Sequence, residues 1–182
     1  SQTRNLIRYL MRHRHTSPFE MCEVKFHLKL PIFVMRQLVR HRTANLNEYS
    51  GRYSIMSDEF YFPRGDEIKP QSSTNNQGRE EGELSVHSGE AEFEMYRIFD
   101  GSSNAYKNLV DWNVSRELAR IVLPVSNYTE VIWKIDLHNF FHFIKLRSDK
   151  HAQQEIQDFA NAMYELVKPK FPLCCEAFED YV

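Results

Sequence analysis

The chain has 182 residues, of which 42% are hydrophobic and 26% charged, so it is long enough to fold as one domain around a core. A formal net charge of -2 argues against a protein that coats nucleic acid along its whole surface, and no apolar stretch is long enough to span a bilayer. The three cysteines, Cys22, Cys174 and Cys175, form a sparse and odd set that favours a reducing compartment. We therefore expect a cytoplasmic protein with no membrane partner and no nucleic-acid partner.

The first part of the chain predicts a strand, a helix and a second short strand. Residues 21–30 alternate between apolar and polar side chains, which is typical of a half-buried strand. Pro31 stands where a helix could start, and the apolar spacing after it predicts a helix with the basic residues 40–42 on its last turn. We expect a loop over 43–48 and a short strand with a glycine over 48–56.

The rest of the chain is predicted to be mainly helical. The polar segment 69–83 is rich in turn formers and predicts a mobile surface loop. The elements after it are helices over 90–99 and 105–112 with a break at 100–103, a short helix over 115–124 stopped by Pro124, a strand over 128–136, a helix over 139–147, and a helix from Ser148, as its N-cap, to Lys168. The buried stripe of that last helix is expected at Ala152, Ile156, Phe159, Ala160, Met163 and Val167.

This order of elements lacks the regular strand–helix alternation of a doubly wound fold. It predicts a single α+β domain over residues 1–182, with a mixed or antiparallel sheet flanked by helices. The chain contains no GxGxxG or GxxxxGK[ST] sequence, so any nucleotide is held without a Rossmann turn or a P-loop. GxSxG and HExxH are absent too, which excludes the commonest hydrolase signatures.

Two clusters of ionisable residues allow both a structural and a functional interpretation. His138 and His142 are four positions apart on an expected helix, and with Asp136 they have the spacing of a zinc site. The structural alternative is a pair of polar side chains on an aromatic helix, which we favour, so we expect no metal. The basic run at 12–15 is either a solvated helix end before a Ser-Pro turn or an anion site.

Residues 40–53, RHRTANLNEYSGRY, combine arginine, histidine, glutamate, serine and tyrosine with almost nothing suited to a core. Arginine forks and a serine hydroxyl can clamp phosphate, and a glutamate can accept hydrogen bonds from a ribose or a ring N–H. The spacing closely resembles RHRxxSxNExSxRY, the signature of the flavin-dependent thymidylate synthases. The one departure is Asn45, where that family usually has serine. The matching residues are Arg40, His41, Arg42, Asn47, Glu48, Ser50, Arg52 and Tyr53.

The resemblance extends over nearly the whole chain, because HTSPFE (15–20), ARIVLP (119–124) and LRSDKHAQQEI (146–156) look like family segments in the family's order. Family members normally carry a further N-terminal segment, which we expect to be missing here because the chain begins at Ser1. The resemblance implies a homotetramer with active sites at subunit interfaces. It also implies conversion of dUMP to dTMP in de novo dTMP biosynthesis, with 5,10-methylenetetrahydrofolate as carbon donor and NADPH-reduced FAD as hydride source.

The resemblance also implies individual site residues. It places FAD contacts at His15, Ser17, Arg40, His41, Arg42, Glu48, Asp136, Leu137, His138 and His142. It places dUMP contacts at Gln37 and Arg40, with the intervening Leu38 and Val39, on one subunit, at Glu48, Tyr49, Ser50, Gly51 and Arg52 on another, and at Arg120 and Arg147. Some members have asparagine where Asp136 and His142 stand, and a carboxylate cannot donate as an amide does.

Arg147 is the expected catalytic residue, because a cation beside the uracil ring favours its N3-deprotonated form and stabilises developing negative charge. Ser50 has no adjacent base and is interpreted as a substrate ligand rather than a nucleophile. Cys174 and Cys175 lie outside the signature and are expected to be structural. Two alternatives remain open: a nucleic-acid-binding module that uses the arginine clusters, and a metalloprotein built on His138 and His142.

Overall fold

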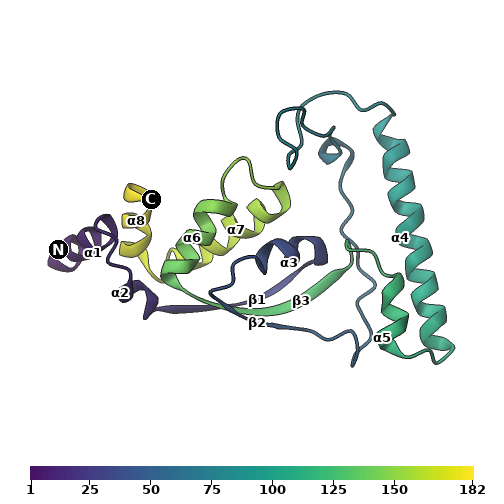
Figure 1. The fold of residues 1–182 in the computed structure, drawn as a ribbon, viewed down its shortest axis with the longest axis horizontal. Coiled ribbons are helices and arrows are strands. Elements are labelled where there is room, and N and C mark those ends of the chain that lie inside the picture. The colour runs from purple at the N-terminus through teal and green to yellow at the C-terminus, as the bar shows by residue number, and fades with distance from the viewer. The chain divides into compact units, whose positions relative to one another are not determined.

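The computed structural model covers residues 1–182 and has an α+β architecture, with helices and a small antiparallel sheet of strand order β1-β3-β2 (Figure 1). No helix combines the length and the apolar character that a membrane crossing requires. The strands are β1 (Glu23–Pro31), β2 (Asn45–Glu48) and β3 (Tyr128–Asp136). The helices are α1 (Gln2–Arg12), α2 (Ser17–Glu20), α3 (Ile32–Leu38), α4 (Ser88–Asp111), α5 (Arg116–Ala119), α6 (Leu137–Arg147), α7 (Gln154–Val167) and α8 (Pro172–Tyr181), with short 3-10 turns η1 (Gly65–Glu67) and η2 (Arg120–Val122).

The two long strands confirm the alternation predicted from the sequence. In β1 every second residue from Phe26 onward is buried, and in β3 the buried positions again alternate with exposed or half-buried ones. The bounds of β3 are those predicted. Strand β1 runs one residue further than expected, because Pro31 ends the strand rather than starting the helix.

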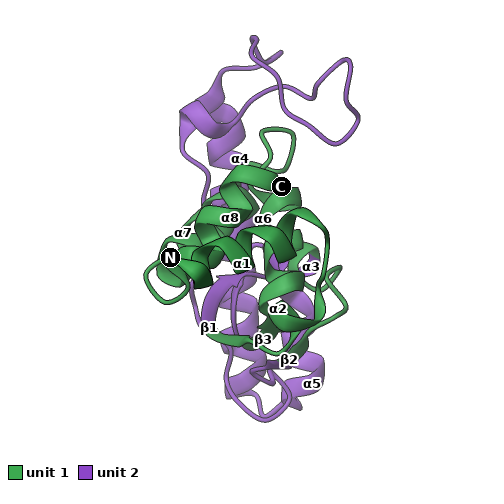
Figure 2. Cartoon of the chain, turned by 90° about the vertical axis from the view of Figure 1, so that its left-hand side faces the viewer, with its two compact units in different colours: residues 1–26, 37–46, 132–182 green, residues 27–36, 47–131 purple.

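The chain divides into two compact units, and each is assembled from separate stretches of sequence (Figure 2). Unit 1 comprises residues 1–26, 37–46 and 132–182, and unit 2 comprises residues 27–36 and 47–131. The boundary at residues 46 and 47 falls inside the signature, so its first half belongs to unit 1 and its second half to unit 2.

Unit 1 has an aromatic core. The ring of Phe26 stacks on Phe140 with centroids 5.7 Å apart, and Trp133 meets the edge of Phe143 at 5.2 Å. Such pairs contribute beyond simple area burial, because the ring quadrupoles are complementary. Helix α7 contributes the predicted stripe: Ile156, Ala160, Met163 and Val167 are buried, whereas Ala152 and Phe159 are half-buried.

Two helices of unit 1 that were not predicted from the sequence, α1 and α8, contact each other at its edge. Arg8 donates to Glu176 at 3.1 Å, pairs with Asp180 and donates to Tyr181 at 3.0 Å. Helix α1 has no fully buried residue.

Unit 2 is organised along the long helix α4. Ser103 donates to Asp58, the backbone N–H of Met56 donates to the Tyr106 hydroxyl at 2.9 Å, and Phe60 stacks on Phe99 at 5.5 Å. The predicted break at 100–103 is wrong, because α4 runs through it. Ser103 is buried and hydrogen-bonded there, and Gly101 faces open space, so neither interrupts the helix.

The helix after Pro31 is shorter than predicted, and the basic residues 40–42 lie beyond its end. The N–H groups of Arg40 and His41 bond three residues back, to Gln37 at 3.3 Å and Leu38 at 3.1 Å, which tightens and ends the last turn. The expected loop over 43–48 contains β2, and the expected strand over 48–56 is wrong. The β ladder ends there because the Ser50 carbonyl accepts from Tyr53 and Ser54, both at 3.1 Å, and so turns the chain.

The expected N-cap of the next helix is also wrong. Ser148 is the C-cap of α6, and α7 begins six residues later, at Gln154, with Gln153 as its N-cap. Asp149 accepts from the N–H of His151 at 2.8 Å, which holds the intervening residues in a turn. The segment 69–83 is irregular apart from an isolated bridge between Gln71 and Arg79, as expected of a loop, and its mobility stays a prediction.

Candidate active site

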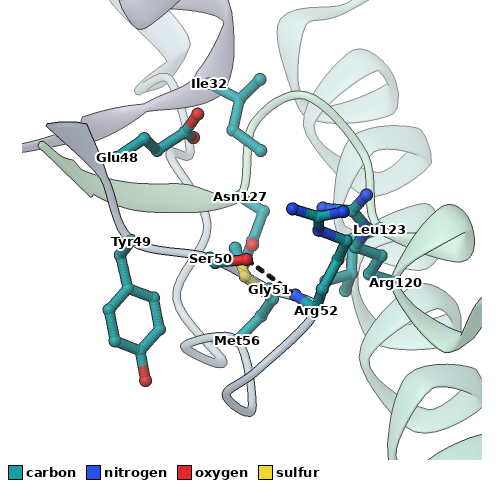
Figure 3. A pocket seen from close by; sticks show the side chains of 10 residues that line it. All are labelled: Ile32, Glu48, Tyr49, Ser50, Gly51, Arg52, Met56, Arg120, Leu123 and Asn127. Atoms are coloured by element: carbon teal, nitrogen blue, oxygen red, sulfur yellow. Dashed lines mark hydrogen bonds between the residues drawn. The ribbon is translucent and has the colours of Figure 1, made fainter. Parts of the chain in front are cut away.

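A cavity of about 350 Å³ in unit 2 is lined by the second half of the signature. Glu48, Tyr49, Ser50, Gly51 and Arg52 form one wall, and Arg120 from η2 reaches the same space. Figure 3 shows the guanidinium groups of Arg52 and Arg120 close together on one side of the cavity. Residues that are far apart in the sequence are thus brought together at this cavity. The remaining lining residues are Ile32, Met56, Leu123 and Asn127.

The backbone of this wall is fixed by hydrogen bonds. The N–H of Tyr49 donates to the carbonyl of Glu130 at 2.8 Å, which extends the pairing with β3. The hydroxyl of Thr129 donates to the Glu48 carboxylate at 2.8 Å, and Ser50 Oγ accepts from the N–H of Arg52 at 3.3 Å. The Arg52 guanidinium contacts only the ring of Tyr53, at 5.6 Å, and therefore remains available to an anion.

Gly51 is the buried residue of the wall, and its lack of a side chain shapes the cavity. A Cβ added there would lie 2.5 Å from Met56 Sδ and 3.4 Å from Cδ of Arg120. Because glycine has no Cβ, the thioether of Met56 and the side chain of Arg120 can lie close to the backbone of Gly51.

A second group of predicted residues meets in unit 1, around Arg147 at the end of α6. Its Nε donates to Nε2 of His41 at 3.0 Å, and its two terminal nitrogens donate to the side-chain and main-chain oxygens of Gln37, both at 3.4 Å. Gln37 in turn donates to Gln153. The partners of the arginine are thus a neutral imidazole and amide oxygens rather than a carboxylate, so its positive charge is left uncompensated.

His41 is held in its neutral form. Its pKa is lowered to about 4, first by partial burial and then by the positive charges of Arg147 and His142. Because Nε2 accepts from Arg147, the neutral ring carries its proton on Nδ1 and can donate from there. The edge-on contact with Phe143, at 5.0 Å, fixes the ring plane. The pKa of Arg147 is also lowered, by burial and by the nearby charge of Arg40, but an arginine remains charged.

A cavity of about 420 Å³ in unit 1 contains other predicted residues. His15 reaches it from the segment between α1 and α2, and His138 and His142 reach it from α6. Its apolar wall is formed mainly by Phe19, Phe141 and the end of α8, and its cationic lining residues are Arg12, Arg14 and Lys145. Cations beside an apolar wall suit a ligand that carries both phosphates and a flat ring, so this lining fits part of a flavin dinucleotide.

Comparisons with known proteins identify the family of the chain. The family described as "Thymidylate synthase complementing protein" matches residues 1–173. The chain belongs to this family.

Relatives with about half of their residues identical are named flavin-dependent thymidylate synthase, so the predicted family is confirmed. One from Dictyostelium discoideum is 51% identical over 181 residues, which is 100% of this chain and 59% of the relative. One from Treponema denticola is 53% identical over 175 residues, which is 96% of this chain and 66% of the relative. The chain therefore spans less than two thirds of the length of these thymidylate synthases.

A solved structure in the same fold is also similar. It is the crystal structure of a UMP/dUMP methylase, PolB from Streptomyces cacaoi, bound with 5-Br UMP. It superposes with a TM-score of 0.91 at 34% identity, and the match covers 99% of this chain and 84% of that one. The predicted α+β fold is therefore confirmed as the fold of a known nucleotide methylase.

Four positions that the resemblance assigns to ligand contacts do not line either cavity. Leu38 and Leu137 are fully buried, so their side chains belong to the core. Ser17 begins α2 and is exposed, but it does not line the unit 1 cavity. Asp136 caps α6, where its carboxylate accepts from the N–H of Asn139 at 2.9 Å and from the side-chain amide of Asn139 at 2.8 Å. Whether these positions contact a ligand stays a prediction.

The histidine pair lies at a cavity, and the adjacent cysteines are buried or half-buried. His138 and His142 line the same cavity, but the chain contains no cluster of three or more His, Cys, Asp or Glu side chains that could hold a metal ion. Cys175 is buried, and burial raises the pKa of both thiols, that of Cys174 to about 11. Such thiols are poor nucleophiles, which agrees with a structural role.

Several cavity residues were not among the sequence-predicted site residues, and Lys145, Met56 and Asn127 are three of them. Lys145 follows His142 by three positions on α6, and helical spacing alone places it on the same face. Met56 and Asn127 lie outside the signature, and no local pattern marks them. Asn127 directly precedes β3 and comes to the cavity only through the pairing of that strand.

Proposed function

We propose that the chain is part of a FAD-dependent thymidylate synthase that converts dUMP to dTMP by reductive methylation, in de novo dTMP biosynthesis. The carbon donor is 5,10-methylenetetrahydrofolate, and NADPH supplies the reducing equivalents. The main support is the cavity of unit 2, where Glu48 to Arg52 and Arg120 meet in a member of the family. The names of the relatives, and the brominated nucleotide bound to the similar methylase, support the substrate.

The unit 2 cavity is proposed to bind the dUMP phosphate and sugar. Arg52 and Arg120 supply guanidinium forks for the phosphate, and the Ser50 hydroxyl can donate to it while accepting from the backbone. Gln37, Leu38, Val39, Arg40 and Arg147 are proposed to contact the base, with the signature residues Glu48 to Arg52 supplied by a neighbouring subunit. This arrangement requires an oligomer, for which we propose a homotetramer.

Arg147 is proposed as the electrostatic activator of the uracil ring. A cation next to the ring stabilises the negative charge that spreads over N3 and the carbonyl oxygens when C5 acts as a nucleophile. His41 and Gln37 orient this cation without neutralising it, since neither carries a negative charge. Preorganised charge of this kind needs no rearrangement during the reaction.

The unit 1 cavity is proposed to hold part of the FAD, which supplies the hydride chemistry when bound. Arg12, Arg14 and Lys145 are placed to neutralise its phosphates, and His15, His138 and His142 to donate hydrogen bonds. His41 would donate from Nδ1 at the edge of the same group, and Arg42 is exposed and free to join. A cytoplasmic location is also proposed, which the sparse free cysteines support.

An absorption spectrum of the purified protein tests the proposal most directly. We expect a yellow protein whose flavin bands bleach when NADPH is added without oxygen, and a melting temperature that rises with added dUMP. Addition of dUMP and the folate donor should then yield dTMP. A colourless protein that is not stabilised by dUMP would refute the proposal, and strongly salt-dependent oligonucleotide binding would favour a nucleic-acid-binding module instead.

Complementation tests the shared site. At limiting dUMP, the Arg52→Ala and Arg147→Ala variants are each expected to be nearly inactive, because the first binds dUMP weakly and the second turns it over slowly. If the two arginines of one site come from different subunits, mixing and reassembling the two variants restores part of the activity, since some sites then receive both native arginines. No recovery in verified mixed oligomers would contradict the subunit-spanning site.

A further inference from the structure

Asn127 combines complete burial with an unpaired polar atom in the wall of the unit 2 cavity. The residue is 0% exposed, and its Oδ1 has no hydrogen-bond partner. Its side chain extends toward Ser50 (Figure 3), next to the signature wall. A buried acceptor without a donor lowers the stability of the fold. A ligand in the adjacent cavity that donates a hydrogen bond to this oxygen would remove that cost.

The orientation of the amide is fixed by its other end. The Nδ2 group donates to the carbonyl oxygens of Ser57 at 2.8 Å and Glu59 at 3.0 Å. A flipped amide would place Oδ1 against these two acceptors, so the oxygen must be the unpaired atom. The backbone is held as well, because Asn127 donates to Pro124 at 3.0 Å and accepts from Ile32 at 3.0 Å.

The neighbouring groups of the cavity have other partners or are donors. The Glu48 carboxylate accepts from Thr129, Ser50 Oγ accepts from Arg52, and the arginines only donate. A ligand that satisfies the whole wall therefore carries negative charge for the arginines and a neutral donor for Asn127. A nucleoside monophosphate has both, in its phosphate and in its sugar hydroxyls.

The side chain of Met56 is the movable part of this wall. It lines the cavity with Asn127, and its sulfur lies against Gly51. An unbranched thioether has three rotatable bonds and repacks at low cost. The amide oxygen is closed to solvent in the free protein, so a bound sugar reaches it only when a lining side chain moves, and Met56 is the lining side chain that moves at the lowest cost.

We propose that Asn127 Oδ1 accepts a hydrogen bond from a hydroxyl of the nucleotide sugar and so makes binding depend on that hydroxyl. The inference rests on the proposed function, because it takes the unit 2 cavity as the nucleotide site. It adds a specificity-determining residue outside the signature.

The test compares the affinities of the oligomeric flavoprotein for UMP, dUMP and 2′,3′-dideoxyuridine monophosphate, measured by calorimetry. The native protein should bind the dideoxy compound about fivefold to tenfold more weakly than dUMP, as expected for one neutral hydrogen bond. In Asn127→Ala this ratio should fall to about one, because the acceptor is gone. The only free sugar hydroxyl of dUMP is at the 3′ position, so this loss would assign the 3′-hydroxyl. If the native protein instead binds dUMP and the dideoxy compound equally, tighter binding of UMP would assign the 2′-hydroxyl, and equal binding of all three nucleotides would overturn the inference.

Ser126→Ala is the matched control, because Ser126 is the adjacent buried residue with an unpaired hydroxyl but does not line the cavity. It should keep the native ratio. A purely structural role of Asn127 would weaken the binding of all three nucleotides equally and leave the ratio unchanged, which would overturn the inference. If the variant does not fold, a crystal structure of the native protein with dUMP decides, and a sugar hydroxyl beyond hydrogen-bond distance from Oδ1 overturns it. Failure of the native protein to bind any of the nucleotides would refute the proposed function instead.

Discussion

The two halves of the signature are held by different kinds of contact. In unit 1, His41 is held by Arg147 and Phe143, which lie about a hundred positions later in the sequence. In unit 2, residues 50–54 form their own turn, which the Ser50 carbonyl closes, and only Glu48 and Tyr49 bond to the distant strand β3. One continuous motif therefore contains one half whose geometry depends on tertiary packing and another that is largely local.

The two halves therefore have different expected roles. The unit 1 half orients a single charge, that of Arg147, by neutral partners. The unit 2 half presents backbone groups and the free guanidinium group of Arg52 to a cavity that Arg120 also lines. We expect substitutions in the first group to affect turnover and substitutions in the second to affect nucleotide affinity.

Arg147→Ala should have the largest effect. Loss of the activating charge is expected to lower turnover by about 100-fold or more, as for other preorganised electrostatic groups, with the flavin content largely retained. Rates of dTMP formation and the flavin absorbance per subunit measure the two quantities. Arg97→Ala is the control, because Arg97 is exposed on α4 and pairs only with Glu94. Loss of the flavin together with activity would mean that Arg147 has a different role.

Arg52→Ala should have the next largest effect, on binding. Removing one charged donor to the phosphate is expected to weaken dUMP binding by about 10- to 100-fold and to change flavin binding much less. Titration calorimetry with dUMP, compared with flavin retention on a desalting column, separates the two. Unchanged dUMP affinity would remove Arg52 from the nucleotide site and weaken the contrast between the halves.

Gly51→Ala should have a smaller effect on the same wall. The added methyl group collides with Met56 Sδ, but that side chain is flexible and can move, so we expect about a fivefold loss of dUMP affinity or less. Thermal unfolding of the free protein should change little. A large fall in the melting temperature of Gly51→Ala would show that the wall is rigid and that the Met56 side chain cannot move away.

The pH dependence of stability should show the smallest effect and tests the unit 1 half. His41 has its pKa lowered from 6.5 to about 4, so between these values the unfolded chain binds a proton that the folded chain does not. The contribution of His41 to stability is therefore complete above pH 6.5 and is lost as the pH falls toward 4. In His41→Gln the melting temperature should fall less over this range than in the native protein. An identical pH profile would show that His41 is not held neutral.

The sequence alone identified the family and most of the lining of the unit 2 cavity. The local spacing of Ser50 and Arg52 survives in the structure because their turn is built from neighbouring backbone groups. Strand β3 and the stripe of α7 were also predictable, since burial on one face leaves a period in the sequence. The single domain over 1–182 stays a prediction.

Only the tertiary structure decided where the helices begin and end, and which residues far apart in the sequence contact each other. Helix α4 continues through a glycine and two serines because Asp58 binds Ser103, a contact that no local pattern contains. The same holds for the bond between Arg147 and His41 and for the unpaired oxygen of Asn127. Periodicity in the sequence records which face of an element is buried, whereas hydrogen bonds between residues far apart depend on where the folded chain brings them.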